Sequence, residues 1–240
     1  MKPTLGVLSC RRRIALVAAG LLVLAVPLVA AAVSVRLSAD GGVTWIQCDD
    51  GAACDLTSAP GVVTFSGSVG PFTVNVTTAI TEPALGSASF AILDLTNVSV
   101  SGGSGSLIIQ ASHTGYTGPL PGGMYPALLS VGGTAPPGGT VSFAGYLDDG
   151  NTLFGTTSLL GTLGPFGPPA FSGSVAGAAG ATAPFALTLV ANITHTRADS
   201  NTSFDFEVRP RVAEPGMLSL FGIGLGSVLV GGRRRLRISA

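Results

Sequence analysis

Charged residues are scarce in this 240-residue sequence, where they make up 10%, and no lysine follows Lys2. The 12 basic and 12 acidic residues balance over the whole chain, but eight of the basic ones lie at its two ends. Between residues 33 and 214, four arginines remain against all 12 acids, which gives this region a formal charge of 4 − 12 = −8. Nucleic-acid binding needs clustered cations that replace counterions, so we expect no nucleic-acid partner.

Aromatic residues are also few, at 6% of the sequence, and a Gly-x-Ser-x-Gly nucleophile elbow is absent. The two histidines, His113 and His195, are expected to be solvated residues near strand ends. Asp205 and Glu207 share one face of a predicted strand and could serve a glycosidase, but this spacing is common on solvated sheets. We therefore expect no enzymatic activity and no catalytic residues.

Only three cysteines occur, and two of them, Cys48 and Cys54, flank a short segment with an Asp-Gly turn. In an oxidising compartment this spacing predicts a local disulfide. A metal site is the alternative, but two thiols with no second pair and no nearby histidine make poor zinc ligands. The disulfide is therefore the preferred interpretation.

Two acidic turns offer oxygen ligands of the kind that a hard cation needs. Neither turn has EF-hand spacing, and Asp-Gly and Gly-Asn are also ordinary turn dipeptides. A structural calcium ion is the alternative to ordinary turns here, and no other cofactor is expected. The candidate calcium ligands are Asp49, Asp50, Asp55, Asp148, Asp149 and Asn151.

Between the two apolar ends, short β-rich runs alternate with turns rich in Gly, Pro, Asn and Asp, and helix signals are nearly absent. Residues 62–69 and 72–77 flank Gly70-Pro71 and predict a hairpin. The run 65–69 recurs at 171–175, again ahead of a Pro-Phe pair, which suggests a second related hairpin. Ten or eleven strands predict an antiparallel β-sandwich, with a β-barrel as the alternative. The predicted strands cover residues 33–37, 43–47, 62–69, 72–77, 92–100, 107–112, 127–131, 140–147, 171–175, 185–196 and 203–208.

The N-terminus has the composition of an export signal. Lys2 and Arg11-Arg12-Arg13 form a basic region, residues 14–29 are apolar, and Ala30-Ala31-Ala32 offers small residues for cleavage. This order predicts a secretory signal peptide over residues 1–32, recognised by Sec-type export machinery and signal peptidase. An uncleaved signal anchor and a twin-arginine route are the alternatives.

The C-terminus, residues 212–240, combines a short motif, an apolar segment and a basic end. Residues 217–232 would span about 24 Å as a helix, slightly less than the roughly 20 residues that a bilayer core requires. Arginines after this segment are expected to stay in the cytoplasm, so the tail suits a transient anchor in the inner membrane. The alternatives are a permanent tail anchor and an apolar helix docked on the domain. The motif is Val212, Ala213, Glu214 and Pro215, and the basic end at 233–237 contains Arg233, Arg234, Arg235 and Arg237.

This tail resembles the PEP-CTERM sorting domain of Gram-negative bacteria, in which a Val-Pro-Glu-Pro motif precedes a transmembrane segment and an arginine cluster. Ala213 stands where the first proline of the family motif is usual. The resemblance implies processing by exosortase, a membrane protease. Residues 61–77, 93–100 and 148–154 also resemble a group of PEP-CTERM proteins of unknown function, which implies a location and a fold but no activity.

We therefore expect three parts: a signal helix (1–32), a secreted β-sandwich domain (33–211), and a sorting tail with a transmembrane helix (212–240). The expected location is the cell surface or the extracellular space after tail processing. Function divides into two classes: a structural or adhesive component of an exopolysaccharide matrix or biofilm, and a carbohydrate-binding module or polysaccharide-acting hydrolase. The second class would favour exposed aromatic rings that converge on one surface. The candidate rings are Trp45, Tyr116, Tyr125 and Tyr146.

Overall fold

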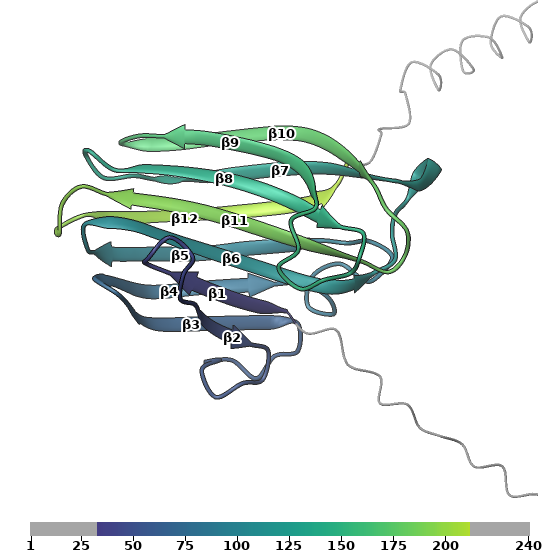
Figure 1. Ribbon diagram of the computed structural model, residues 1–240, viewed down its shortest axis with the longest axis horizontal. Helices are drawn as coiled ribbons and strands as arrows, with labels where there is room; N and C mark the ends of the chain where they lie inside the picture. Colours follow the sequence, from purple (N-terminus) through teal and green to yellow (C-terminus); the bar gives the residue numbers. More distant parts are fainter. Residues whose placement is uncertain (1–32, 212–240) are drawn as a thin grey trace, which may run out of the picture. The chain divides into compact units, whose positions relative to one another are not determined.

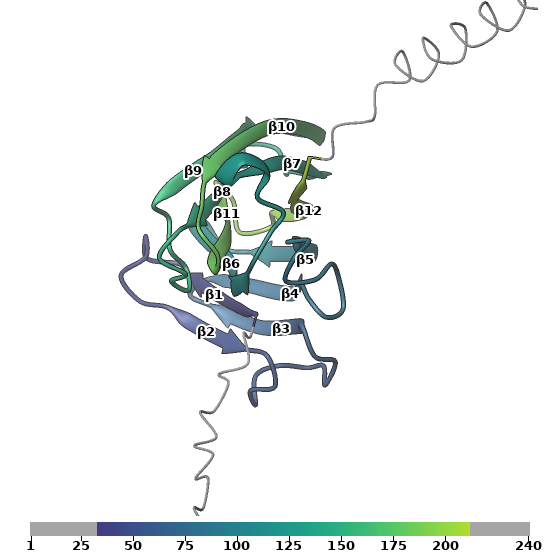
Figure 2. The ribbon, with the colours of Figure 1, turned by 90° about the vertical axis from the view of Figure 1, so that its right-hand side faces the viewer.

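The computed structural model describes residues 33–211, which form two six-stranded antiparallel sheets packed face to face (Figures 1 and 2). Sheet A has the order β2-β1-β6-β11-β8-β9, and sheet B has the order β10-β7-β12-β5-β4-β3. The predicted antiparallel sandwich is confirmed in place of the barrel alternative. No helix within residues 33–211 has the length and apolar character needed to cross a membrane. The predicted signal helix and sorting tail lie outside the described residues.

The strands account for most of the described chain, and one short 3-10 helix, η1 (Pro121–Gly123), precedes β7. The strands are β1 (Ser34–Ser38), β2 (Ile46–Asp49), β3 (Val62–Val69), β4 (Phe72–Ile80), β5 (Leu93–Gly102), β6 (Gly105–Tyr116), β7 (Met124–Thr134), β8 (Thr140–Asp148), β9 (Ser158–Phe166), β10 (Ala170–Gly180), β11 (Phe185–His195) and β12 (Asn201–Pro210).

The last eight strands follow the order of a jelly roll. Strands β10-β7-β12-β5 make up one half and β6-β11-β8-β9 the other, and apart from β8 and β9 no neighbours in these two sets are consecutive in the chain. The first four strands extend both sheets at the same edge: β1 and β2 continue sheet A beyond β6, and β4 and β3 continue sheet B beyond β5. Figure 1 shows these N-terminal strands side by side at the lower edge.

Alternation of side chains explains why these segments form strands. Along β12, Phe204, Phe206 and Val208 are buried between the sheets, while Asp205 and Glu207 point out of sheet B. The same period of two fills the interior from both sheets and leaves polar side chains on the two outer faces. The outer faces are therefore where a ligand can be contacted.

The described residues form twelve strands, one more than the upper predicted number, because β9 is not among the predicted strands. This strand, Ser158–Phe166, contains Gly161, Gly164 and Pro165, which read as turn residues. Tertiary packing explains them. Gly161 lies against Val175 of β10, where an added Cβ would come within 2.7 Å of a side-chain carbon. The predicted strand at 43–47 was also placed too early, since β2 begins at Ile46.

The predicted hairpins have different outcomes. β3 and β4 pair in sheet B around Gly70-Pro71, as expected. The second copy of the motif does not form a hairpin, because β10 belongs to sheet B and β11 to sheet A. β10 instead pairs with β7 along its whole length, and its backbone passes so close to β9 that a Cβ on Gly177 would lie 1.7 Å from the Leu160 carbonyl oxygen.

Candidate functional site

A shallow groove lies on the outer face of sheet B, over the neighbouring strands β5, β12 and β7. It consists of two adjoining depressions of about 510 and 340 Å³ that share Gly132 and Asp205. Gly132 lies opposite Asp205 in the β7–β12 register, and the nearest heavy atom to a Cβ built on it is 4.0 Å away. The missing side chain therefore leaves the space that forms the groove floor. The polar residues that line it are Asp94, Thr96, Asn97, Ser99, Ser130, Thr134, Ser203, Asp205 and Glu207.

Three carboxyl groups meet at one end of this groove. Glu207 of β12 is directly opposite Asp94 of β5. Asp205 precedes Glu207 by two residues and lies on the same face of β12. Asp205 Oδ1 accepts hydrogen bonds from Thr96 Oγ1 and the Asn97 backbone N–H, both at 2.7 Å. Glu207 Oε1 lies 3.4 Å from Nε of Arg209. These contacts fix Asp205 and give Glu207 a partner.

Asp94 is the unusual member of the three. Partial burial, followed by repulsion from Glu207 and Asp205, raises its pKa from 3.8 to about 7. Near neutral pH this carboxyl group is therefore about half protonated beside carboxylates that only accept hydrogen bonds. Together with the hydroxyl and amide groups, the groove presents both donors and acceptors to a polar ligand.

This pKa predicts how stability depends on pH. The raised pKa means that the folded state holds a proton that the unfolded chain releases above about pH 4. The stabilisation is complete below that pH and is lost as the pH rises towards 7. We expect Asp94→Asn to raise the free energy of unfolding by about 1–2 kcal/mol at pH 8, after allowance for solvent screening, and to change it little at pH 4. Urea unfolding of the purified protein at pH 4 and at pH 8 measures this.

Asp199→Asn is the matched control, because Asp199 lies in an exposed loop with 75% of its side chain accessible. It should shift both measurements by a few tenths of a kcal/mol at most. Parallel pH profiles for the wild type and Asp94→Asn would contradict the assignment of the proton to Asp94.

The expectation that both histidines are solvated is wrong. His113 is 0% exposed and His195 is 1% exposed. Nε2 of His113 lies 3.3 Å from Oε1 of Glu82, and its ring packs edge-on to Tyr116. His195 contacts the Gly102 carbonyl oxygen through Nδ1 and Thr202 Oγ1 through Nε2, both at 2.8 Å. Both side chains are buried between the sheets, and their contacts connect sheet A with residues of, or next to, sheet B.

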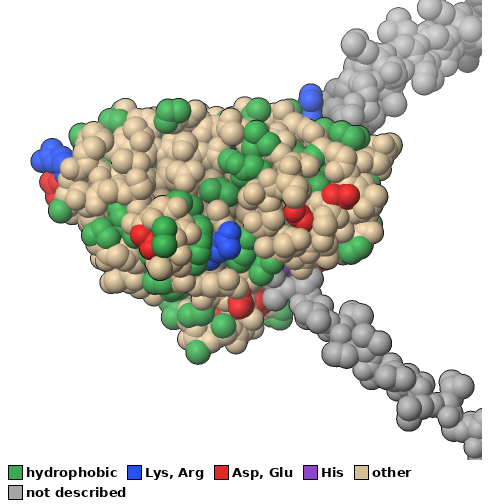
Figure 3. Space-filling view, in the orientation of Figure 1, with side chains coloured by type: hydrophobic (Ala, Val, Ile, Leu, Met, Phe, Trp, Pro, Cys, Tyr) green, Lys and Arg blue, Asp and Glu red, His purple; other side chains and the backbone are tan. Residues whose placement is uncertain are grey.

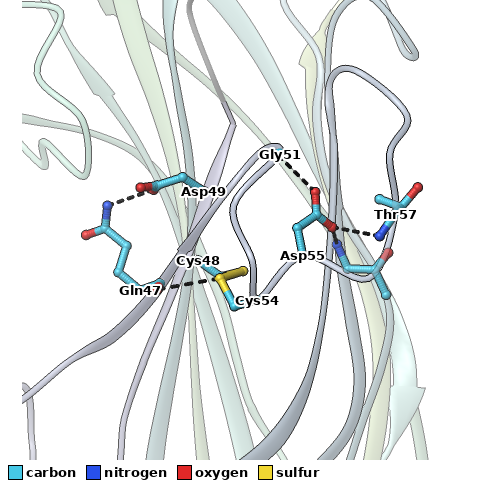
Figure 4. Close-up of a disulfide and its surroundings, with 8 residues drawn as sticks. Gln47, Cys48, Asp49, Gly51, Cys54, Asp55 and Thr57 are labelled. Atoms are coloured by element: carbon cyan, nitrogen blue, oxygen red, sulfur yellow. Dashed lines mark hydrogen bonds between the residues drawn. A yellow bond between two sulfur atoms is a disulfide. The ribbon is translucent and has the colours of Figure 1, made fainter.

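The predicted disulfide between Cys48 and Cys54 is confirmed, with an S–S distance of 2.12 Å (Figure 4). Nearby, the three acids of the first candidate calcium turn contact different partners. Asp49 accepts from the Gln47 amide, Asp50 from the Gly61 backbone N–H, and Asp55 from three backbone N–H groups. Figure 4 shows Asp49 and Asp55 on opposite sides of the disulfide, directed away from each other.

In the second candidate calcium turn, the side-chain oxygens likewise accept hydrogen bonds from protein groups. Asp148 Oδ1 accepts from the Thr152 backbone N–H, Asp149 Oδ1 accepts from the backbone and hydroxyl of Thr182, and Asn151 Oδ1 accepts from the Gly115 backbone N–H. Among residues 33–211, no group of three or more His, Cys, Asp or Glu residues lies together to hold a metal ion. These side chains shape turns in the structure.

The four aromatic rings do not converge on one surface. Tyr116 and Tyr125 are 0% exposed, and their hydroxyl groups donate to the carbonyl oxygens of Ile92 and Ala91 in the interior. Trp45 and Tyr146 are partly exposed and lie away from the groove, Trp45 in the β1–β2 connection and Tyr146 on β8 of sheet A. The groove itself has polar walls, since its two phenylalanines, Phe204 and Phe206, are buried beneath it.

Comparisons with known proteins identify a similar architecture only at low similarity. No family model matches the chain, and no curated protein sequence matches it. Similar solved structures include the C-terminal CBM6 of LamC, a marine laminarinase from Zobellia galactanivorans, with 13% identity over 62% of this chain and 98% of that chain, at a TM-score of 0.27.

Two further solved structures match at similarly low scores. An isomalto-dextranase from Arthrobacter globiformis T6 complexed with panose matches with 12% identity over 62% of this chain and 23% of that chain, at a TM-score of 0.27. TmCBM27, a mannan-recognising carbohydrate-binding module, matches with 16% identity over 63% of this chain and 99% of that chain, at 0.29. Scores this low do not assign a function to this chain.

Proposed function

We propose that this protein is exported to the cell surface or the extracellular matrix, where its β-sandwich domain binds polysaccharide without cleaving it. The export signal and the sorting tail support the location, and the −8 charge between residues 33 and 214 suits a domain that stays dispersed outside the cell. The proposed role is a structural or adhesive one in an exopolysaccharide matrix.

The observation that carries the proposal is the open polar groove of sheet B. Sugars present many hydroxyl groups, each of which can donate and accept, and the groove offers carboxylates, hydroxyls and an amide along three strands. The two depressions follow one another along these strands, which suits a polymer chain lying on the open face rather than a small molecule enclosed in a pocket. Because no exposed aromatic ring lines the groove to stack on a sugar, each contact should be weak, and adhesion would come from many copies acting together.

Filling the groove tests this proposal. Gly132→Tyr places a ring on the groove floor and is expected to weaken binding to a neutral polysaccharide about tenfold, or about 1.4 kcal/mol. Gly167→Tyr makes the same change in the β9–β10 connection, where a Cβ meets no atom within 4 Å, and should bind normally. The measurement is retention of the exported protein on immobilised α- and β-glucans, galactans and xylans. Equal retention of both variants, or no retention of the wild type on any polymer, would refute groove binding.

Polysaccharide hydrolysis is the second candidate, and one observation favours it. Asp94 with its pKa of about 7 is a possible proton donor beside Glu207, and glycosidases pair a protonated acid with a carboxylate. The open face of a sheet does not exclude water around such a pair, so we expect binding without turnover. Release of reducing ends from a bound polymer that stops in Asp94→Asn would replace our proposal with a hydrolase.

A further inference from the structure

A second polar site lies on the outer face of sheet A, on the side of the sandwich away from the groove. Its centre is Arg36 of β1, whose guanidinium carbon is 4.3 Å from the Trp45 ring centroid and 4.1 Å from that of Phe154. Arg36 Nε donates to Oε1 of Gln110 on β6 at 2.7 Å. We call these four residues the Arg36 cluster. They come from four separate segments of the chain, so the fold assembles them.

The Trp45 side of the cluster is held by the β1–β2 connection. The Asp40 carboxylate accepts hydrogen bonds from the backbone N–H groups of Val43 and Thr44 and from the hydroxyls of Ser38 and Thr44. These bonds hold the pKa of Asp40 well below its usual range. A Cβ on Gly42 would lie 3.2 Å from the Trp45 ring, so the loop backbone packs directly against the indole.

The Phe154 side is held by the β8–β9 connection, which folds back over sheet A. The Phe154 backbone N–H donates to Ser112 Oγ of β6 at 2.9 Å, and Asn151 Oδ1 accepts from the Gly115 N–H at 2.7 Å. Phe154 is only 8% exposed and has a positive φ of 59°, a conformation that non-glycine residues seldom adopt. This segment therefore places the ring against Arg36 at some conformational cost.

Arg36 lacks a counter-ion among residues 33–211, as does Arg211, whereas the other two arginines of this region are paired. Arg197 and Arg209 each lie 3.4 Å from an acid, Asp199 and Glu207 respectively. Within residues 33–211, Arg36 forms no ion pair, and its two terminal nitrogens have no hydrogen-bond acceptor. Partial burial lowers the pKa of its guanidinium, which fits a charge that has lost water without gaining a counter-ion. Figure 3 shows the surrounding face to be mostly uncharged.

We infer that Arg36, positioned by Trp45, Phe154 and Gln110, binds an oxyanion carried by an acidic polysaccharide, either a uronate carboxylate or a sulfate ester. A guanidinium with a fixed plane and two terminal nitrogens that have no protein acceptor suits bidentate binding of such an anion. The aromatic rings and Gln110 restrict its rotation before the ligand arrives, which reduces the entropy lost on binding. This inference goes beyond the groove, because it concerns another sheet and a charged class of ligand.

The chain contains one tryptophan, and it is part of this cluster, so its fluorescence reports on the site. The probes are dextran, carboxymethyl dextran and dextran sulfate, which share a backbone and differ in the anion they carry. Titration of the exported protein at low ionic strength should change Trp45 fluorescence with one or both charged polymers and not with dextran. The polymer that binds more tightly identifies the anion. A response to dextran equal to that of the charged polymers, or no response to any of the three, would overturn the inference.

Three arginine variants make the test specific. Arg36→Gln should weaken binding of the charged dextran about tenfold, and Arg36→Lys should lose most of that affinity because it keeps the charge but not the planar fork. Arg197→Gln removes the same charge from an exposed loop and should bind normally, with circular dichroism confirming that all three variants fold. Normal binding by Arg36→Gln, or an equal loss in Arg197→Gln, would show that Arg36 is not the receptor.

The two proposals can fail separately. Gly132→Tyr should leave the Trp45 response unchanged, and Arg36→Gln should leave retention on neutral polymers unchanged. If instead Gly132→Tyr abolished the Trp45 response, the Arg36 cluster would not be an independent site.

Discussion

Replacing Phe143 with alanine is expected to lower the free energy of unfolding by about 4 kcal/mol. Phe143 of β8 is 2% exposed and lies between the sheets. Its ring centroid is 4.9 Å from that of Phe204 and 5.0 Å from that of Phe206, both on β12 of the opposite sheet. It also contacts Phe166 of β9 and Phe171 of β10, at 6.2 and 5.9 Å. Alanine would therefore remove contacts with four rings on three strands and leave a cavity where the jelly-roll halves meet.

Urea unfolding followed by circular dichroism measures this effect, and Phe90→Ala provides the control. Phe90 is the same residue type with 40% of its surface accessible, so truncation there should cost about 0.5 kcal/mol or less. Similar losses for the two variants would mean that the ring cluster around Phe143 does not join the sheets as described.

Local patterns predicted most of the fold. The 62–69 strand was placed at its observed bounds because apolar and polar residues alternate and Gly70-Pro71 marks the turn. β9 is not predicted because its glycines resemble turn residues, whereas in the structure Gly161 is required by close packing against β10 and Gly164 by a positive φ of 91° within the strand. The histidines were misjudged for a related reason. Their hydrogen-bond partners Glu82, Gly102 and Thr202 are met only when the sheets are assembled.

The candidate sites were only partly predictable. Asp205 and Glu207 could be placed on one strand face from their spacing alone. Asp94 lies more than 100 residues earlier and joins them only through the β5–β12 register, which no local pattern specifies. The contact of Arg36 with Trp45 and Phe154 depends in addition on two loop conformations. Sites assembled from several strands and loops are therefore the part of this protein that local sequence patterns do not predict.

The two proposed sites lie on the outer faces of opposite sheets, and this placement bears on the role of the protein. One molecule could contact two polysaccharide chains at once, a neutral one over sheet B and an acidic one over sheet A. Bivalent contact of this kind raises the strength of attachment without requiring a tight individual site. It is the property that a matrix component needs, and it explains how weak, solvent-exposed sites could be sufficient.

Tail processing has the largest expected effect of any change outside the domain. We expect the exported protein to lack residues 217–240, and we expect a variant with Glu214→Ala and Pro215→Ala to retain them and stay with the membrane. The resemblance of 212–215 to a sorting motif, followed by an apolar segment and four arginines, is the reason. Intact-mass measurement of the secreted and membrane fractions distinguishes the two products.

Ala213→Pro is the informative companion variant, because it restores the proline that is usual in the sorting motif. It should be processed at least as completely as the wild type, whereas a permanent tail anchor would respond to neither change. Since the 16-residue apolar segment is slightly short for a bilayer, an unprocessed tail would hold the domain at the membrane only weakly. A secreted wild-type product that still carries residues 217–240 would therefore rule out processing and leave the location to be explained by slow loss from the membrane.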